Sequence, residues 1–176
     1  MRRDLISLVP WFADNELLLC PACCRPVSYD DISVEHIVQK QALACDPVDV
    51  RQSIPQNDRS GLTLLCRKPL VIKGKRIPGD GCNSWKGRHY DAFLRELLST
   101  DFQTRKINTR HQVSLFCAGY LALVRKFGMQ ITLSAAGLLS RRQFFCPNNF
   151  IKDIPVNCQI LLAGQPLSEI TEDSRK

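Results

Sequence analysis

The sequence predicts an α+β fold in which two short strands and a helix come first and a mainly helical part follows. Residues 33–38 alternate polar and apolar side chains, and residues 62–66 form a short apolar run, which are patterns typical of strands. A helical segment is expected to begin at residues 83–87. Residues 113–127 repeat apolar side chains at helical spacing and end before Gly128, a common helix terminator.

Length and charge limit the domain organisation and the class of partner. A chain of 176 residues is expected to form one compact domain or a main domain with an extension. We place the main unit at residues 1–100 and the extension at residues 101–176. The 24 Lys and Arg against 17 Asp and Glu give a net charge of +7, which favours a polyanionic partner.

Neither an export signal nor a membrane span is predicted. The basic start is interrupted by Asp4, Asp14 and Glu16 where a signal peptide needs an apolar stretch. The longest uncharged apolar run, residues 113–124, is too short to cross a bilayer of roughly 30 Å as a helix. We therefore expect a cytoplasmic protein that has no membrane span.

Four of the nine cysteines are spaced as metal ligands: Cys20, Cys23, Cys66 and Cys82. Cytosolic thiols stay reduced, so metal binding is a better explanation for them than a disulfide framework. Two thiolates in a Cys-x-x-Cys turn can hold one Zn²⁺, and a second pair supplied by the fold completes a tetrahedral site. The sequence thus predicts a structural zinc site.

Two alternatives remain open for these cysteines. A Cys-x-x-Cys pair can also be a redox dithiol, although Pro21 and Pro26 favour a loop over the helix start that such a motif requires. Cys24 could also replace Cys23 as a ligand.

Fifteen residues separate Cys66 from Cys82, a long insertion that a loop can accommodate because closure entropy grows slowly with length.

This insertion is basic and is predicted to be a hairpin or loop. Residues 67–76 carry five cations, among them Lys73, Lys75 and Arg76. They form either a solvated charged loop or an arm that contacts phosphates.

The elements of the extension are predicted from shorter patterns. We expect a helix over residues 90–98, a short strand over residues 130–133, and a helix capped by Ser134 that ends at Phe145. Residues 151–162 have a β-like composition.

Together these segments resemble the HNH endonucleases, a family with a ββα-metal fold. The matching pieces, over residues 17–90, are the Cys-x-x-Cys pair, Glu35-His36 at the end of the first strand, residues 61–66 (Gly-Leu-Thr-Leu-Leu-Cys) and residues 82–87 (Cys-Asn-Ser-Trp-Lys-Gly). The resemblance implies an HNH module with a four-cysteine zinc knuckle. It also implies an endonuclease that requires a divalent metal ion.

The candidate active-site residues are Glu35, His36 and Asn83. A neutral imidazole at His36 is suited to act as the base that activates water. The oxygens of Glu35 and Asn83 are suited to bind one catalytic Mg²⁺ or Mn²⁺, and the resemblance implies the same division of roles. Lys86, on the same helical face as Asn83, and Arg88 are candidates for phosphate contacts, with Lys73, Lys75 and Arg76 on the insertion.

The chain departs from the family pattern in two ways, in the fifteen-residue insertion before Cys82 and at position 61. Gly61 stands where the family has its middle Asn, which braces the loop that carries the catalytic histidine. Asn57 or Asp58 could take over that role.

The expected substrate is double-stranded DNA, and the family occurs in restriction and anti-phage defence. A companion sensor or ATPase protein is therefore an expected partner. Two other functions remain open. The chain could be a catalytically inactive, zinc-stapled module that binds nucleic acid or a protein partner, or it could be an RNA-cleaving toxin.

Overall fold

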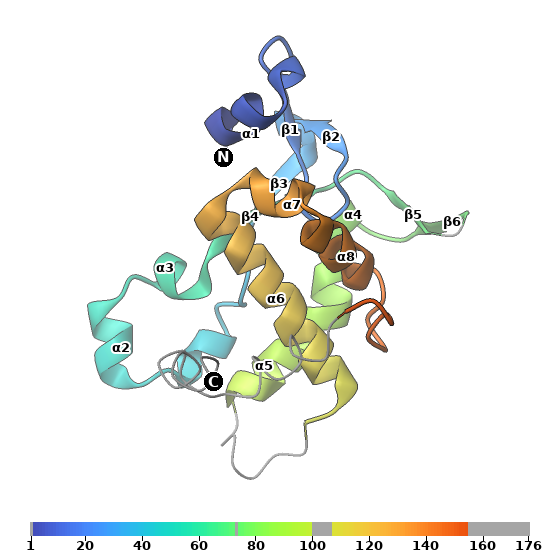
Figure 1. Cartoon of the computed structure of the whole chain (residues 1–176). Coiled ribbons are helices and arrows are strands. Elements are labelled where there is room, and N and C mark those ends of the chain that lie inside the picture. Colours follow the sequence, from blue (N-terminus) through green and yellow to red (C-terminus); the bar gives the residue numbers. More distant parts are fainter. Residues whose placement is uncertain (1, 73, 100–106, 155–176) are drawn as a thin grey trace, which may run out of the picture.

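The structure is a computed structural model that describes residues 2–72, 74–99 and 107–154. In these residues the fold is mixed α and β, with small two-stranded antiparallel sheets and a helical C-terminal part (Figure 1). The predicted fold class is confirmed at this level. Lys73 and the predicted β-like stretch from residue 155 onward lie outside the described residues, and residues 151–154 contain no strand.

The strands pair in the order in which they occur along the chain. The pairs are β1 (Leu17–Leu19) with β2 (Pro26–Ser28), β3 (Ile32–His36) with β4 (Leu62–Cys66), and β5 (Leu70–Ile72) with β6 (Lys75–Ile77). The two strands predicted from the sequence are thus β3 and β4, and the predicted basic hairpin is β5–β6. In the β3–β4 register Ile32 lies opposite Cys66, so His36, opposite Leu62, ends its strand beside the start of β4.

Helices make up most of the remaining described chain. They are α1 (Arg2–Leu8), α2 (Val48–Ser53), α3 (Gln56–Ser60), α4 (Gly81–Lys86), α5 (Ala92–Ser99), α6 (Thr109–Phe127), α7 (Met129–Leu133) and α8 (Ala135–Phe144). Short 3-10 turns are η1 (Pro10–Phe12), η2 (Tyr29–Asp31) and η3 (Ala42–Cys45), and η4 (Gly87–Asp91) is a π turn between α4 and α5. None of the helices in the described ranges combines the length and the apolar character needed to cross a bilayer.

Helix α6 runs through the middle of the molecule and organises its core (Figure 1). It begins at a capping box, in which the Asn108 side chain accepts from the backbone of His111 and the His111 ring accepts from the backbone of Asn108. It ends at Gly128, as predicted, where φ is 82°. Its buried face includes Val113 and Leu121 and packs against β4, η4 and α5.

The predicted strand at residues 130–133 is wrong, because this segment is part of helix α7. The positive φ of Gly128 turns the chain so that α7 starts at once. Met129 and Thr132 are buried three residues apart, which is helical spacing. The next helix, α8, is capped as predicted, since the backbone N–H of Gly137 donates to Ser134 Oγ over 3.0 Å.

The two parts of the chain share one hydrophobic core. Trp85 Nε1 donates to the carbonyl oxygen of Phe144 over 2.7 Å, and Tyr90 Oη donates to the same oxygen. Tyr120 Oη on α6 donates to the carbonyl oxygen of Pro21 over 2.7 Å. Helix α6 is therefore fastened directly to the predicted cysteine turn. The domain boundary at residue 100 stays a prediction.

Helix α4 docks closely on the turn between β4 and β5 because its first residue is glycine. Gly81 has φ of +56°, and a Cβ there would lie 2.4 Å from the carbonyl oxygen of Cys66 and 2.5 Å from that of Lys68. This close approach carries the next residue, Cys82, to the end of β4.

We expect Gly81→Ala to destabilise the protein more than Gly74→Ala does. Both glycines have positive φ, but nothing lies within 4 Å of a Cβ added at Gly74, which makes it the matched control. The backbone conformation alone should cost about 1–2 kcal/mol at either site. The clash at Gly81 should add about 1–3 kcal/mol. Urea unfolding measures the difference, and equal losses of stability in the two variants would contradict the close docking of α4.

Candidate metal centre and active site

Three cysteines from separate parts of the sequence meet in one cluster. The Sγ atoms of Cys20, Cys23 and Cys82 all lie within 4.8 Å of one another, and these residues could hold one metal ion. Cys20 directly follows β1, Cys23 lies in the turn before β2, and Cys82 lies in the first turn of α4. Cys24, with φ of 56°, is not part of this close group, so the structure selects Cys23 from the adjacent pair.

The fourth predicted ligand, Cys66, lies beside this cluster without joining the close group of three. Its backbone N–H donates to Cys20 Sγ over 3.3 Å. Arg25 connects the same two sides, because its Nη2 donates to Cys66 Sγ over 3.5 Å and its Nε donates to Cys23 Sγ over 3.4 Å. A cationic side chain and a backbone donor thus both face the sulfur atoms.

The protons in the cluster are shared unequally. Hydrogen bonds from the thiols of Cys20 and Cys82, assisted by Arg25, lower the pKa of Cys23 to about 2. The hydrogen bond to Cys23 raises the pKa of Cys20 to about 12. Hydrogen bonds to Cys20 and Cys23 raise the pKa of Cys82 as well. Thiolates are the metal-binding form, so an ion must displace the protons that Cys20 and Cys82 retain.

The cysteine cluster lies next to a second group of polar residues that come together in the fold. Asn83 directly follows Cys82, and its Nδ2 donates to Glu35 Oε1 on β3 over 2.7 Å. Two of the three predicted active-site residues are therefore in contact, although 48 positions separate them in the sequence. Because the bond uses the amide N–H, the amide oxygen and the remaining carboxylate lone pairs are the atoms that could bind a divalent cation.

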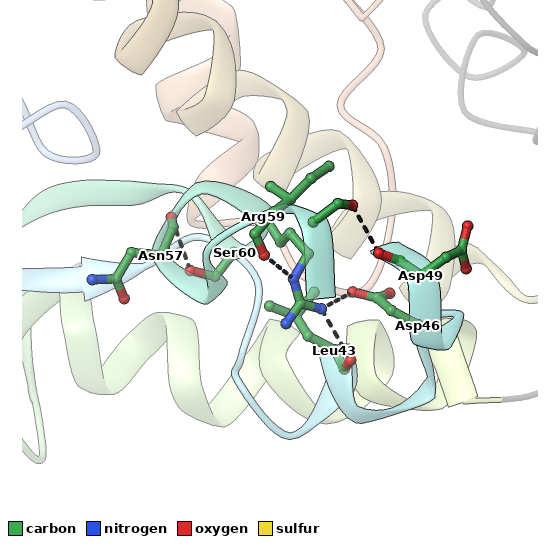
Figure 2. Close-up of polar contacts among 8 residues, drawn as sticks. Leu43, Asp46, Asp49, Asn57, Arg59 and Ser60 are labelled. Carbon is green, nitrogen blue, oxygen red and sulfur yellow. Dashed lines mark hydrogen bonds and ion pairs between the residues drawn. The ribbon is translucent and has the colours of Figure 1, made fainter. Parts of the chain in front are cut away.

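His36 is held by a residue that the sequence analysis did not identify. His36 Nδ1 lies 2.7 Å from the hydroxyl of Ser60, the last residue of α3. Ser60 Oγ also donates to the carbonyl oxygen of Asn57 over 3.2 Å (Figure 2). Of the two residues suggested as replacements for the middle Asn, Asn57 thus contributes through its backbone. Asp58 instead pairs with Arg125, with Oδ1 3.4 Å from Nη2.

Backbone geometry explains the glycine at position 61. Gly61 has φ of +65°, and a Cβ would lie 3.1 Å from both Ile37 Cδ1 and Arg125 Nη1. Its carbonyl oxygen accepts from the backbone of Ile37 over 2.9 Å, and that of Ser60 accepts from Val38 over 3.0 Å. These bonds extend the β3–β4 pairing past His36, so the position is shaped for glycine and not for asparagine.

The surroundings of His36 favour its neutral form. Burial lowers its pKa, and the positive charges of Lys40 and Lys86 lower it further, while Glu35 acts in the opposite direction. The net direction is downward from the ordinary value of 6.5, so the ring is neutral at physiological pH.

Lys86, which is predicted to contact phosphate, is paired inside the protein in the structure. The Lys86 side chain is only 4% exposed, and its Nζ lies 2.5 Å from Asp91 Oδ1. The π turn η4 brings Asp91 back to Lys86 five residues earlier in the chain, so the charge is used inside the protein. Arg88 is exposed, as a phosphate contact requires, and its Nη2 donates to the carbonyl oxygen of Pro78 over 3.0 Å.

The β5–β6 hairpin projects from the body of the molecule (Figure 1). Lys75 and Arg76 on β6 are exposed, and Lys73 lies outside the described residues. At the base of the hairpin, Arg25 donates to the carbonyl oxygen of Lys68 over 3.1 Å and to that of Pro69 over 3.2 Å. The hairpin itself is confirmed, and its contact with nucleic acid stays a prediction.

Comparisons of the chain with protein-family models, with curated proteins and with solved structures give no match. A function for the protein is therefore proposed from the geometry and chemistry of the site.

We expect the purified protein to contain about one tightly bound metal ion per chain and Cys20→Ser to lose both the ion and the fold. Binding and folding are one equilibrium at structural metal sites, worth roughly 10–16 kcal/mol in small zinc modules. Cys146→Ser is the matched control because Cys146 is exposed and lies outside the cluster. Elemental analysis with circular dichroism measures both properties. A folded wild-type protein without metal would contradict the metal centre.

Proposed function

We propose that the protein is a metal-dependent endonuclease of the HNH type, which hydrolyses phosphodiester bonds in DNA. The main support is the bond between Asn83 Nδ2 and Glu35 Oε1, next to His36. It joins two oxygen donors at the end of β3, beside a cluster of cysteines, and the residue after Glu35 supplies an imidazole. This is the set of groups that metal-assisted hydrolysis of a phosphodiester needs.

Each side chain has a defined role in this proposal. When bound, Mg²⁺ or Mn²⁺ neutralises the charge that develops on the phosphate oxygens. Glu35 and Asn83 hold that ion through their oxygens. His36 takes the proton from the attacking water, whose oxygen then bonds to phosphorus as the bond to the 3′ oxygen breaks. The 3′ oxygen receives a proton from solvent, which leaves a 5′-phosphate and a 3′-hydroxyl.

The structural ion in this proposal is Zn²⁺. Thiolates favour zinc among the common divalent ions, and in this proposal Cys66, whose backbone N–H donates to Cys20 Sγ, would be the fourth ligand beside Cys20, Cys23 and Cys82. Four thiolates around Zn²⁺ carry a net charge of −2. Arg25, which donates to two of these sulfur atoms, would balance part of that charge.

The DNA contacts are assigned to Lys75 and Arg76 on the hairpin and to Arg88, all of them exposed. These cations would position a phosphate backbone without reading its sequence. A role in anti-phage defence, with a companion sensor or ATPase, remains an expectation from the family resemblance.

One observation favours a second candidate function. Lys86 is buried and paired with Asp91, so the helix of the candidate active site offers one cation fewer to a substrate. A binding module that has lost catalysis would need no phosphate contact at this position. Activity measurements separate the two functions.

We expect His36→Ala to reduce divalent-dependent DNA cleavage by a factor on the order of 10²–10⁴, as loss of a general base typically does. Metal content and DNA affinity should stay close to those of the wild type, because the base contributes little to binding of the substrate. His89→Ala is the matched control, since the His89 ring packs against Trp85 and has no role in the proposal. Nicking of a supercoiled plasmid measures the rate.

Glu35→Ala and Asn83→Ala should in addition raise the Mg²⁺ concentration needed for half-maximal activity, because they remove ligands. If the wild type cuts neither DNA nor RNA with any divalent ion, the binding module is the better account. Cleavage of RNA alone would indicate the toxin.

We expect the double variant Lys75→Gln, Arg76→Gln to weaken DNA binding and reduce its salt dependence. Removing one cation that neutralises a phosphate should lower the slope of log K against log salt by roughly 0.9 for duplex DNA. Arg51→Gln with Arg95→Gln, two exposed cations elsewhere, is the control that keeps the net charge equal. Fluorescence anisotropy at several salt concentrations gives the slopes. The same slope in both double variants would show that the hairpin is only a solvated loop.

A further inference from the structure

We propose that Ser60 is a positioning residue that fixes His36 with its hydrogen on Nδ1 and its lone pair on Nε2, and that Arg59 holds Ser60 in place. The assignment of the His36 tautomer is independent of the proposed function. The consequence of that tautomer for catalysis rests on the proposed function.

The hydrogen bonds of Ser60 support this position for the proton of His36. A serine hydroxyl has one hydrogen, and Ser60 Oγ donates it to the carbonyl oxygen of Asn57 over 3.2 Å. With that hydrogen used on Asn57, the 2.7 Å contact between the same oxygen and His36 Nδ1 is a hydrogen bond only when Nδ1 carries a hydrogen. Ser60 is only 1% exposed, so water does not compete for its hydroxyl.

Arg59 fixes the short helix that carries Ser60. Its Nη1 contacts Asp46 Oδ2 and the carbonyl oxygen of Leu43, and its Nε donates to the carbonyl oxygen of Ile54 over 3.1 Å (Figure 2). The Arg59 side chain is 10% exposed and that of Asp46 is 28% exposed, so the guanidinium end of the ion pair has little contact with water. One guanidinium thus joins η3, the link after α2, and α3.

This arrangement matters because the two imidazole nitrogens are distinct. The hydrogen bond made by one nitrogen decides which form the other takes. A hydrogen held on Nδ1 leaves Nε2 as the acceptor, and Nε2 is then the atom that can take a proton from water. Without the hydroxyl, the ring is free to place its hydrogen on Nε2, where it blocks that role.

His111 provides an internal reference with the opposite tautomer. Its Nδ1 accepts from the backbone N–H of Asn108 over 3.3 Å, and its Nε2 lies 3.1 Å from Glu96 Oε2. The hydrogen of His111 is therefore on Nε2.

Nuclear magnetic resonance of histidine labelled with ¹³C and ¹⁵N tests the assignment directly, at a pH where the rings are neutral. We expect His36 to show the Nδ1–H form and His111 the Nε2–H form in the same spectrum, with His36 assigned by the loss of its signals in His36→Ala. Ser60→Thr, which keeps the hydroxyl, should keep the Nδ1–H form of His36. Ser60→Ala should shift it toward Nε2–H. An Nε2–H form of His36 in the wild type or in Ser60→Thr would overturn the proposal, whether or not Ser60→Ala folds.

Cleavage kinetics test the catalytic consequence. Ser60→Ala should lower kcat by roughly 10- to 100-fold with little change in KM, as is typical when a partner that orients an imidazole is removed, and Ser60→Thr should restore most of the rate. If the wild type cleaves no nucleic acid but the spectra are as expected, the proposed function fails and the role of Ser60 stands. If Ser60→Ala cleaves as fast as the wild type, the positioning role in catalysis is overturned.

The part of Arg59 is tested with a matched pair of variants. Arg59→Ala should shift the His36 ring signals toward those of Ser60→Ala, whereas Arg51→Ala, at an exposed position on α2, should leave them as in the wild type. Unchanged signals in Arg59→Ala would overturn its role.

Discussion

The cysteine cluster is the constraint on which the rest of the structure depends. The β-structure of the described residues consists of two-stranded antiparallel sheets, and a strand pair of that size is marginally stable by itself. Cys20, Cys23 and Cys82 join the β1–β2 hairpin to the start of α4, and Cys66 lies beside them at the end of β4. The cluster thereby sets where α4 lies relative to β3. The contact between Asn83 and Glu35 follows from that placement.

Ion pairs with a buried cation are the second feature that organises the structure. They fix the positions of neighbouring elements more than they stabilise the fold. The pair Lys86–Asp91 and the pair Arg59–Asp46 both place a cation where water has little access. Removing one partner of such a pair typically leaves an uncompensated charge that costs about 3–5 kcal/mol, whereas replacing both can be neutral. Such pairs are thus weak evidence for stability and stronger evidence for a fixed geometry. The first fixes the turn after α4, and the second fixes the helix that ends at Ser60.

The sequence could predict those parts of the fold that have local signals. Alternation identified β3, helical periodicity and Gly128 identified α6, and cysteine spacing identified the three thiols that meet. Residues 130–133 were misassigned because the four-residue stretch Gln-Ile-Thr-Leu is too short for its pattern to separate a strand from a helix. The burial of Lys86 depends on a π turn, which has no periodic signature. Ser60 reaches His36 across 24 positions through tertiary structure alone, and its one local clue is the glycine that follows it.

The Arg25 side chain links the cysteine sulfur atoms to the base of the projecting β5–β6 hairpin. The same guanidinium donates to Cys23 and Cys66 on one side and to the carbonyl oxygens of Lys68 and Pro69 on the other. The negative charge on the sulfur atoms therefore affects how strongly Arg25 is held, and with it the base of the β5–β6 arm. By thermodynamic reciprocity, a molecule that binds the arm and shifts Arg25 also changes the affinity with which these cysteines could hold a metal ion.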